Sequence, residues 1–374
     1  MEKIIILKHF EELEVEEEYA RYDGYYYSVS EAVKLVILGS ICGLRNTKQI
    51  WQWATNEKIR EFLKEKFQIN RVPSYYWLLC LLKMVKPASM NKCFNAWVMS
   101  MLPEEKALTI ALDGKTVRST EKMKSYSSPL HIVSAQLGEL GLTYAQKAVD
   151  GKSNEIPAVQ KLLAELDISG CIVVADALNC QKETAKAVVK GKGDYLLDVK
   201  GNQSTLKKDI EDYVQDEKLQ KSMDVCRKTE KNRDRIETRT AYSNTDIDWM
   251  HCKSNWANLQ CFGAIHTELD TPKGKTSEWH YYISSRPLTA EQLLRHARLE
   301  WSVESMHWLL DVHFSEDYCR VENRNVLQTL NIVRKIALNM VRLYKQETAS
   351  KLALSNIMFN CLVDPSMIMR ILAA

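Results

Sequence analysis

Two acidic residues stand at the ends of apolar runs, where a pair of carboxylates could hold a cation. In residues 107–115, ALTIALDGK, apolar and smaller residues alternate up to Asp113, and this alternation indicates a strand. In residues 171–177, CIVVADA, a continuous apolar run ends at Asp176 and is typical of a strand buried on both faces. An isolated charge in a medium of low dielectric is costly, so buried carboxylates are seldom left unpaired. We therefore predict that Asp113 and Asp176 share a cation at the tips of two core strands.

A third acidic ligand is expected from a later element, because two-metal phosphoryl transfer needs carboxylates around two ions roughly 3.5–4 Å apart. Hard oxygen ligands select Mg²⁺ or Mn²⁺. The candidate is Glu304, which has Trp301 and Trp308 at helical spacing on either side. Glu300 and Asp311 lie one and two turns away on a similar face, so spacing alone does not choose among the three acids. A solvated helix face is the alternative interpretation.

The first hundred residues have the pattern of a small all-helical domain. Ser28 and Glu31 fit a capping box ahead of an apolar run at helical spacing, and further helical stretches follow up to residue 102. Short helices joined by tight turns can place one helix in a DNA major groove, but a plain helical bundle explains the pattern equally well. We assign residues 1–103 to this domain, with its boundary at Pro103–Glu105.

The order of elements changes after residue 105, where strands come first and strands and helices then alternate. Strands are predicted at 107–113, 130–137, 142–149, 171–177 and 195–199, and helices at 155–166, 181–190 and from about 203. A meander followed by parallel β/α units resembles the ribonuclease-H-like fold. In that fold metal-binding acids lie at the tips of the first and fourth strands, which are the positions of Asp113 and Asp176.

Residues 225–287 interrupt this alternation with runs that predict short strands, IETRTAYS, CFGAIH and HYYISS, and with a turn at TPKGK. We predict that they form a β-rich insertion between the first part of the core, 104–224, and C-terminal helices over 288–374 that complete it. The predicted fold class is therefore α/β: a ribonuclease-H-like core with a β-rich insertion, preceded by a small all-helical domain.

The composition is that of an ordinary globular protein. The 374 residues suffice for two or more domains, and 45% of them are apolar and 26% charged. The ten cysteines include no C-x-x-C pair, which favours reduced thiols in the cytosol over a zinc or disulfide framework. No stretch reaches the ~18 apolar residues of a membrane span, and the N-terminus lacks a signal-peptide cleavage pattern. We expect a cytoplasmic location and no membrane partner.

The net charge of +3 is unevenly distributed along the chain. Residues 1–23 hold eight acidic and three basic side chains, which leaves 40 acidic and 48 basic ones, a balance of +8, in the other 351 residues. A modestly basic body can bind nucleic acid, although many enzymes carry such a surplus.

Eight motifs follow one another over about 210 residues. They are ALDGKTVRST (111–120), HIVSAQ (131–136), KSNEIPAVQKLL (152–163), GCIVVADALNCQKE (170–183), GDYLLDVKGNQSTL (193–206), RIETR (235–239), YYISSRPL (281–288) and RLEWSVESMHWLLDVHFSEDYCR (298–320). In this order they resemble the DDE-class transposases of bacterial insertion sequences, in the subgroup of H-repeat-associated proteins. The helical N-terminal region, with VPSYYWLL and FNAWV, is similar to the domain that precedes the core in this family. Each motif is weak alone, but the ordered set is highly specific.

The resemblance implies a catalytic triad that also binds the metal. It falls on Asp113 in the DGK motif, on Asp176 in the ADALNCQK motif and on Glu304 in the W-x-x-E motif. It implies Mg²⁺ or Mn²⁺ as cofactor, and relatives carry a β-rich insertion between the second acid and the glutamate, as predicted here.

Five positions depart from the pattern of relatives or need a separate explanation. Distant relatives have a Tyr, Arg and Lys signature around the glutamate, and these positions are here Ala297, Glu300 and Asp311, so DNA contacts assigned to that signature are not carried over. The subgroup often has His where this chain has Arg233, which puts a role for that position in doubt. His307, one turn after the glutamate, is more simply explained as a histidine satisfied within the fold than as a catalytic one.

The implied function is DNA transposition. Two-metal cleavage at the element ends would free a 3′-OH, which then attacks target DNA. The implied partners are double-stranded DNA, as terminal inverted repeats and as target, and further copies of the chain in a homo-oligomer on paired ends. The expected location is the bacterial cytoplasm, in association with the nucleoid. The alternatives are a catalytically silent or repurposed DNA-binding protein and a structure-selective nuclease on the same fold.

Five polar residues are candidate DNA contacts, each with a structural alternative. Lys115 and Arg118 closely follow the first acid and could hold backbone phosphates, or they could be solvated surface residues. Lys200 and Asn202 come just after a predicted strand, where a polar loop could touch a phosphate or form a turn and helix cap. Arg235 belongs to a basic run that neighbouring acids dilute.

Overall fold

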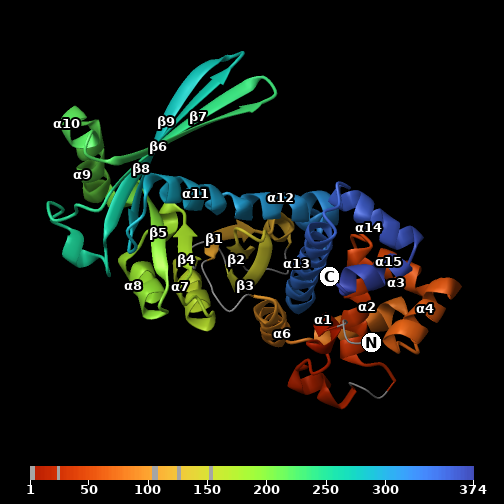
Figure 1. Cartoon of the computed structure of the whole chain (residues 1–374). Coiled ribbons are helices and arrows are strands. Elements are labelled where there is room, and N and C mark those ends of the chain that lie inside the picture. The colour runs from red at the N-terminus through yellow and green to blue at the C-terminus, as the bar shows by residue number, and fades with distance from the viewer. Residues whose placement is uncertain (1–4, 23–25, 103–107, 124–127, 151–154) are drawn as a thin grey trace.

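The computed structural model has a helical N-terminal part and a mixed sheet with its own helices (Figure 1). It describes residues 5–22, 26–102, 108–123, 128–150 and 155–374. The predicted domain boundary at Pro103–Glu105 lies outside these residues. Among the described residues, no helix combines the length and the apolar character needed to cross a bilayer.

Short helices make up the N-terminal part, as the sequence predicts. They are α1 (Ile5–Lys8), η1 (Glu17–Tyr22), α2 (Val29–Ile41), α3 (Thr47–Thr55), α4 (Glu57–Phe67), α5 (Tyr75–Met84) and α6 (Pro87–Ser100). Side-chain oxygens of Asn46, Asn56 and Ser74 accept backbone N–H groups at the starts of α3, α4 and α5. Half of the predicted capping box is present: the Glu31 carboxylate accepts a hydrogen bond from the Ser28 backbone, but the Ser28 side chain makes no capping hydrogen bond.

The strands of the described residues form one continuous sheet. They are β1 (Thr109–Thr116), β2 (Leu130–Leu137), β3 (Leu142–Asp150), β4 (Ile172–Ala175), β5 (Asp194–Val199), β6 (Asp224–Asn232), β7 (Arg235–Asn244), β8 (Cys261–Thr271) and β9 (Gly274–Ser284). Their order across the sheet is β3-β2-β1-β4-β5-β9-β8-β7-β6. The first three strands are an antiparallel meander, and β4 and β5 run parallel to β1. This is the ribonuclease-H-like arrangement that the sequence predicts.

Helices connect the parallel strands in the usual β/α manner. They are α7 (Glu155–Glu165), η4 (Ala177–Asn179) and α8 (Lys182–Lys190), and β5 is followed by η5 (Gly201–Gln203), α9 (Ser204–Gln215) and α10 (Glu217–Gln220).

The β-rich segment extends the core sheet instead of forming a separate one. β9 pairs antiparallel with β5, from Leu196↔Ser284 to Val199↔Tyr281. The four strands of the β-rich segment, β6 to β9, were predicted to be short but have 9 to 11 residues. Their outer ends project from the body as two hairpins (Figure 1), and the first five residues of β9 are exposed. The sequence underestimates the strands because apolar alternation marks only the halves that pack on the core.

The C-terminal helices lie over the sheet and join it to the helical part. They are α11 (Ala290–Glu300), α12 (Ser302–Phe314), η7 (Glu316–Tyr318), α13 (Arg324–Glu347), α14 (Leu354–Val363) and α15 (Ser366–Leu372). One helix was expected from 290 to 314, but the chain is divided at Trp301 into α11 and α12. Buried Leu293 and Leu294 of α11 pack in one cluster with Ile172 and Val174 of β4.

α13 stands between the sheet and the N-terminal helices (Figure 1) and contacts α2, α6 and β3. Its fully buried Asn339 covers the free edge of β3: the side-chain Nδ2 donates to the Thr143 carbonyl at 2.8 Å, and Oδ1 accepts the Thr143 N–H at 2.9 Å. The amide therefore replaces the neighbouring strand that an edge residue lacks.

Replacing Asn339 by Leu should lower the free energy of unfolding by about 2 kcal/mol or more, because both backbone groups of Thr143 lose their partner in a buried place. Urea unfolding followed by circular dichroism measures the change. The matched control is Asn356→Leu, at an exposed asparagine of α14. A loss in Asn339→Leu no larger than in the control would contradict this role.

Candidate active site

Strand register brings three acids together where β4 and β5 end, at the edge of the sheet that runs across the strands. Leu112 of β1 pairs with Ala175 of β4, and Ala175 pairs with Leu197 of β5. The residues that follow these partners are Asp113, Asp176 and Asp198. Parallel strands lie about 4.8 Å apart, and residues two apart share a face, so the three side chains lie next to one another on the face covered by α11.

α11 and α12 follow β1 along this face through three polar contacts. Thr109 Oγ1 lies 2.8 Å from His296 Nδ1, Asp113 Oδ2 lies 3.4 Å from His307 Nε2, and Lys115 Nζ lies 2.7 Å from Asp311 Oδ2. The last two contacts match in spacing, because two strand residues and four helix residues both advance about 6–7 Å. The helix pair is thus held in register with the strand that carries Asp113.

Glu304 lies one turn before His307 in α12. Residues 304, 307 and 311 of α12 follow at helical spacing and lie on one side of that helix. His307 contacts Asp113, and the charges of Asp113 and Asp176 both act on Glu300, so along the chain Glu304 lies between two residues that adjoin the acid pair. Its side chain is exposed, in the first turn of α12.

Negative charge is concentrated at this edge. Burial raises the pKa of the Asp176 carboxyl above its usual value, and the charges of Glu155 and Asp113 raise it further. Burial likewise raises the pKa of Glu300 to about 8, with added effects of Asp198 and Asp176. Lys200, which lies 2.9 Å from Asp198, acts in the opposite direction on Glu300.

The donor set suits a hard divalent cation. All of its acids offer carboxylate oxygens, the ligands that Mg²⁺ and Mn²⁺ prefer. Asp198 Oδ1 is buried and has no hydrogen-bond partner among the described residues. A buried acceptor without a donor is costly, and a cation at this edge would satisfy it.

The predicted DNA contacts have different surroundings. The Lys115 amine lies 2.7, 3.0 and 3.4 Å from carboxylates of Asp311, Glu316 and Asp317, and the side chain is 15% exposed. Its charge is thus neutralised within the protein, and we propose no phosphate contact for it. Arg118 is 80% exposed and lies 3.6 Å from Asp317.

The other three candidates lie on two different parts of the molecule. Asn202 donates to the Ala177 carbonyl at 2.6 Å, which ties the loop after β5 to the turn after Asp176. Lys200 pairs with Asp198 on the same edge. Arg235 lies at the start of β7 on a projecting hairpin, 3.5 Å from Glu237, and the structure does not bring it to the acids.

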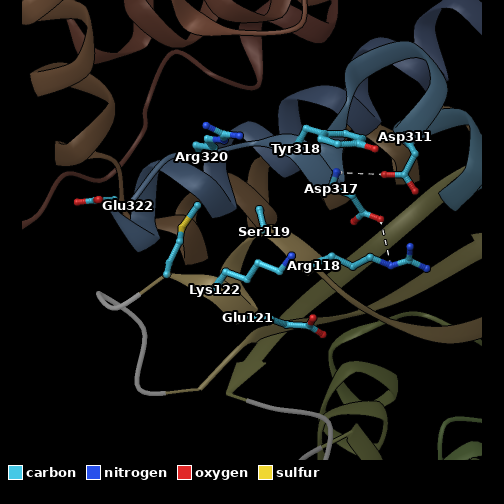
Figure 2. Close-up of a pocket in the computed structure, with 10 residues that line it drawn as sticks. Arg118, Ser119, Glu121, Lys122, Asp311, Asp317, Tyr318, Arg320 and Glu322 are labelled. Carbon is cyan, nitrogen blue, oxygen red and sulfur yellow. Dashed lines mark hydrogen bonds and ion pairs between the residues drawn. The ribbon is translucent and has the colours of Figure 1, made fainter.

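A cavity of about 1130 Å³ lies beside the Lys115 carboxylates, between η2 (Arg118–Lys122) and η7. It is lined by Arg118, Ser119, Glu121, Lys122, Met123, Asp311, Asp317, Tyr318, Arg320 and Glu322. Figure 2 shows Arg118 reaching toward Asp317, and the backbone N–H of Asp317 directed at Asp311. Both signs of charge are mixed over its wall, and we assign no ligand to it.

Family models match most of the chain. One described as "Transposase DDE domain" matches residues 104–340, and one described as "DDE_Tnp_1-associated" matches residues 8–98. The chain belongs to the DDE transposase family. The predicted family is thereby confirmed, and the first match spans the core and the β-rich extension together.

Relatives of this chain occur in Escherichia coli (strain K12). "Putative protein YbfL" is 31% identical over 323 residues, which cover 84% of this chain and 85% of that protein. "H repeat-associated putative transposase YhhI" is 30% identical over 325 residues, covering 84% and 86%. The solved piggyBac transposase synaptic complex with hairpin DNA matches with a TM-score of 0.43 and 10% identity, over 91% of this chain and 72% of that one. A likeness at that level carries no argument.

Several polar residues near these acids escaped the sequence argument. Asp198 ends the apolar run YLLD as Asp176 ends CIVVAD, so the same signal could have found it. Glu155 and Asn179 lie within recognised motifs, but no spacing rule connects them to Asp176. The contact of His307 with Asp113 depends on how α12 lies on β1, which helix periodicity does not determine.

Lys115→Met should lower the free energy of unfolding by about 3 kcal/mol, because it leaves the carboxylate of Glu316, which is 2% exposed, without its ammonium partner. Urea unfolding at pH 7 measures the loss. Arg118→Met is the matched control: it removes an exposed cation beside the same cluster and should cost less than about 1 kcal/mol. Equal losses in the two variants would contradict the structural role of Lys115.

Glu300 should make stability fall as pH rises from about 5 to 8 in EDTA. Its pKa is about 8 in the folded chain, above the ordinary value of 4.5, so the folded state binds more protons than the unfolded state in this window. One group contributes a slope of at most about 1.4 kcal/mol per pH unit. Unfolding across this range should show a smaller decline for Glu300→Gln than for the wild type, and identical slopes would refute the assignment.

Proposed function

We propose that this chain is a metal-dependent DNA transposase in which Asp113, Asp176 and Glu304 form the catalytic, metal-binding triad. The observation that carries the proposal is the pairing of Leu112 with Ala175, which sets the two aspartates side by side. Asp176 directly follows β4, and Asp113 lies within β1, not at the strand tip that the sequence predicts. The contact of His307 with Asp113 supports Glu304 as third member, because it holds the helix of Glu304 against the first acid.

The triad would hold Mg²⁺ or Mn²⁺, which when bound supplies charge stabilisation for the attacking and leaving oxygens of a phosphodiester. The chain's own residues contribute positions. Asp113 and Asp176 are fixed by the strand ladder, and Asp113 is further oriented by His307. Such catalysis rests on positioning and charge neutralisation that are prepared before the substrate arrives.

The proposed substrates are the terminal repeats of the element and a target duplex, and the proposed reactions are strand cleavage and transfer of the freed 3′-OH. We propose that the helical part, residues 1–103, binds the element ends. We also propose that several copies of the chain act together on paired ends. Exposed Arg118 and Arg235, with Lys200 and Asn202 near the acids, are the proposed contacts to DNA.

Asp113→Ala, Asp176→Ala and Glu304→Gln should each lower cleavage in Mg²⁺ by at least about a hundredfold, since each removes a group that stabilises charge in the transition state. The substrate is the DNA that flanks this reading frame, and cleavage is measured on gels with end-labelled strands. Binding of the same DNA in EDTA should be unchanged, which controls for folding.

Glu300→Gln separates the proposed triad from the alternative one turn earlier on α11. If Glu304→Gln cleaves normally and Glu300→Gln does not, the third ligand is Glu300. If Asp176→Ala cleaves normally, the proposed function itself is wrong.

A further inference from the structure

A chain of buried hydrogen bonds lies behind Asp176. His131 of β2 places Nε2 at 2.8 Å from Glu155 Oε2, and Glu155 Oε1 accepts from Asn179 Nδ2 at 2.9 Å. Asn179 Nδ2 also donates to Asp176 Oδ1 at 3.0 Å, and the Asn179 backbone N–H donates to the same oxygen at 3.2 Å. His131, Glu155 and Asn179 are 1%, 2% and 0% exposed.

The hydrogen-bond partners of Asn179, Glu155 and His131 in this series can be named atom by atom. The two amide hydrogens of Asn179 go to Glu155 and Asp176, one each. Each oxygen of Glu155 has one such partner, His131 at Oε2 and Asn179 at Oε1. Thr116 Oγ1 lies 2.9 Å from His131 Nδ1, so both nitrogens of the imidazole have a hydrogen-bond partner. At Asp176, the bonds from Asn179 fall on Oδ1 alone.

Tight packing holds these hydrogen-bonded side chains in place. A Cβ atom added to Gly114 would clash with Glu155 Oε2 and with His131 Nε2. Asn179 lies in the short η4 turn that directly follows Asp176, so its side chain is held at both ends, by the turn and by α7. The rotamer of Asp176 is thereby set by groups that do not face the sheet edge.

We propose that Asn179, oriented by the Glu155–His131 pair, is a positioning residue that fixes the Asp176 carboxylate for cation binding. Two donors hold Oδ1, and the carboxylate is turned so that Oδ2 is available to the cation. This inference rests on the proposed function, in which Asp176 is a metal ligand. Residues that orient a ligand from behind typically change metal affinity by about 10- to 100-fold when they are removed.

The test is a Mn²⁺ titration of the full-length chain without DNA, in which free Mn²⁺ is followed by electron paramagnetic resonance. Asn179→Ala should weaken Mn²⁺ binding by about tenfold. Asn179→Leu, which keeps most of the volume but has no donor, should weaken it as much, and it serves if the alanine variant fails to fold. The Mg²⁺ concentration that gives half-maximal cleavage should rise in parallel. This midpoint distinguishes weaker metal binding from loss of folded protein, because fewer folded molecules lower the maximal cleavage rate but leave the midpoint unchanged.

Two comparisons separate positioning from loss of stability. Asn339→Leu disrupts another buried asparagine far from the acids and should leave the Mn²⁺ affinity unchanged. Glu155→Ala should weaken binding, whereas Glu155→Gln should restore much of it, because a glutamine can accept from Asn179 and donate to the other tautomer of His131.

The outcomes distinguish this inference from the proposed function. If wild-type protein binds Mn²⁺, Asp176→Ala abolishes binding and both Asn179 variants bind like the wild type, then the positioning role is wrong and the triad stands. If the wild type and Asp176→Ala bind Mn²⁺ equally, the proposed function fails, and the positioning role fails with it.

Discussion

Parallel hydrogen bonding of β1 with β4, and of β4 with β5, collects negative charge at one edge of this sheet. Asp113, Asp176 and Asp198 follow residues that are register partners, so they cannot separate unless the strand ladder itself is disrupted. Mutual repulsion and burial oppose this arrangement, and the raised pKa of Asp176 measures that opposition. Main-chain hydrogen bonds and the apolar cores of the strands stabilise the arrangement against this repulsion. Their contribution does not depend on the ionisation of the acids. In the proposed function a cation would reduce this repulsion, so metal binding would be coupled to the stability of this edge.

A second constraint comes from the helix pair over the sheet. On the two sides of the division at Trp301, α11 packs on β1 and β4, and α12 lies over β1. α12 buries apolar residues such as Met306 and Leu310 and adds the polar contacts of His307 and Asp311 to β1. The contacts of His307 and Lys115 hold α12 in place, and the position of Glu304 follows from them.

Sequence reasoning predicted what local pattern determines and missed what the tertiary fold determines. The strand over 130–137 was predicted with its observed bounds, because apolar periodicity marks it, and the acids at 113 and 176 were found because each ends an apolar run. The partners of Lys115 lie 196 to 202 positions along the chain, and no local signal distinguishes a lysine that faces three carboxylates from one that faces a phosphate. The continuity of the β-rich segment with the core was also not predictable, since the pairing of β9 with β5 joins segments about 85 residues apart.

The tripeptide Asp113-Gly114-Lys115 shows how one strand serves both faces of the sheet. Alternate residues point to opposite faces, so Asp113 and Lys115 meet α12, while position 114 adjoins the His131–Glu155 pair on the other face. Glycine is required there because any side chain would displace that pair, and through it Asn179 and Asp176. In terms of the proposed triad, the three residues have different roles: Asp113 is one of its acids, Lys115 holds the helix that carries Glu304, and Gly114 leaves room for the hydrogen bonds that reach Asp176. The Asp-Gly-Lys motif therefore combines three separate structural requirements, one for each residue. The two-residue period of the strand places the glycine on one face of the sheet and the two charged residues on the other.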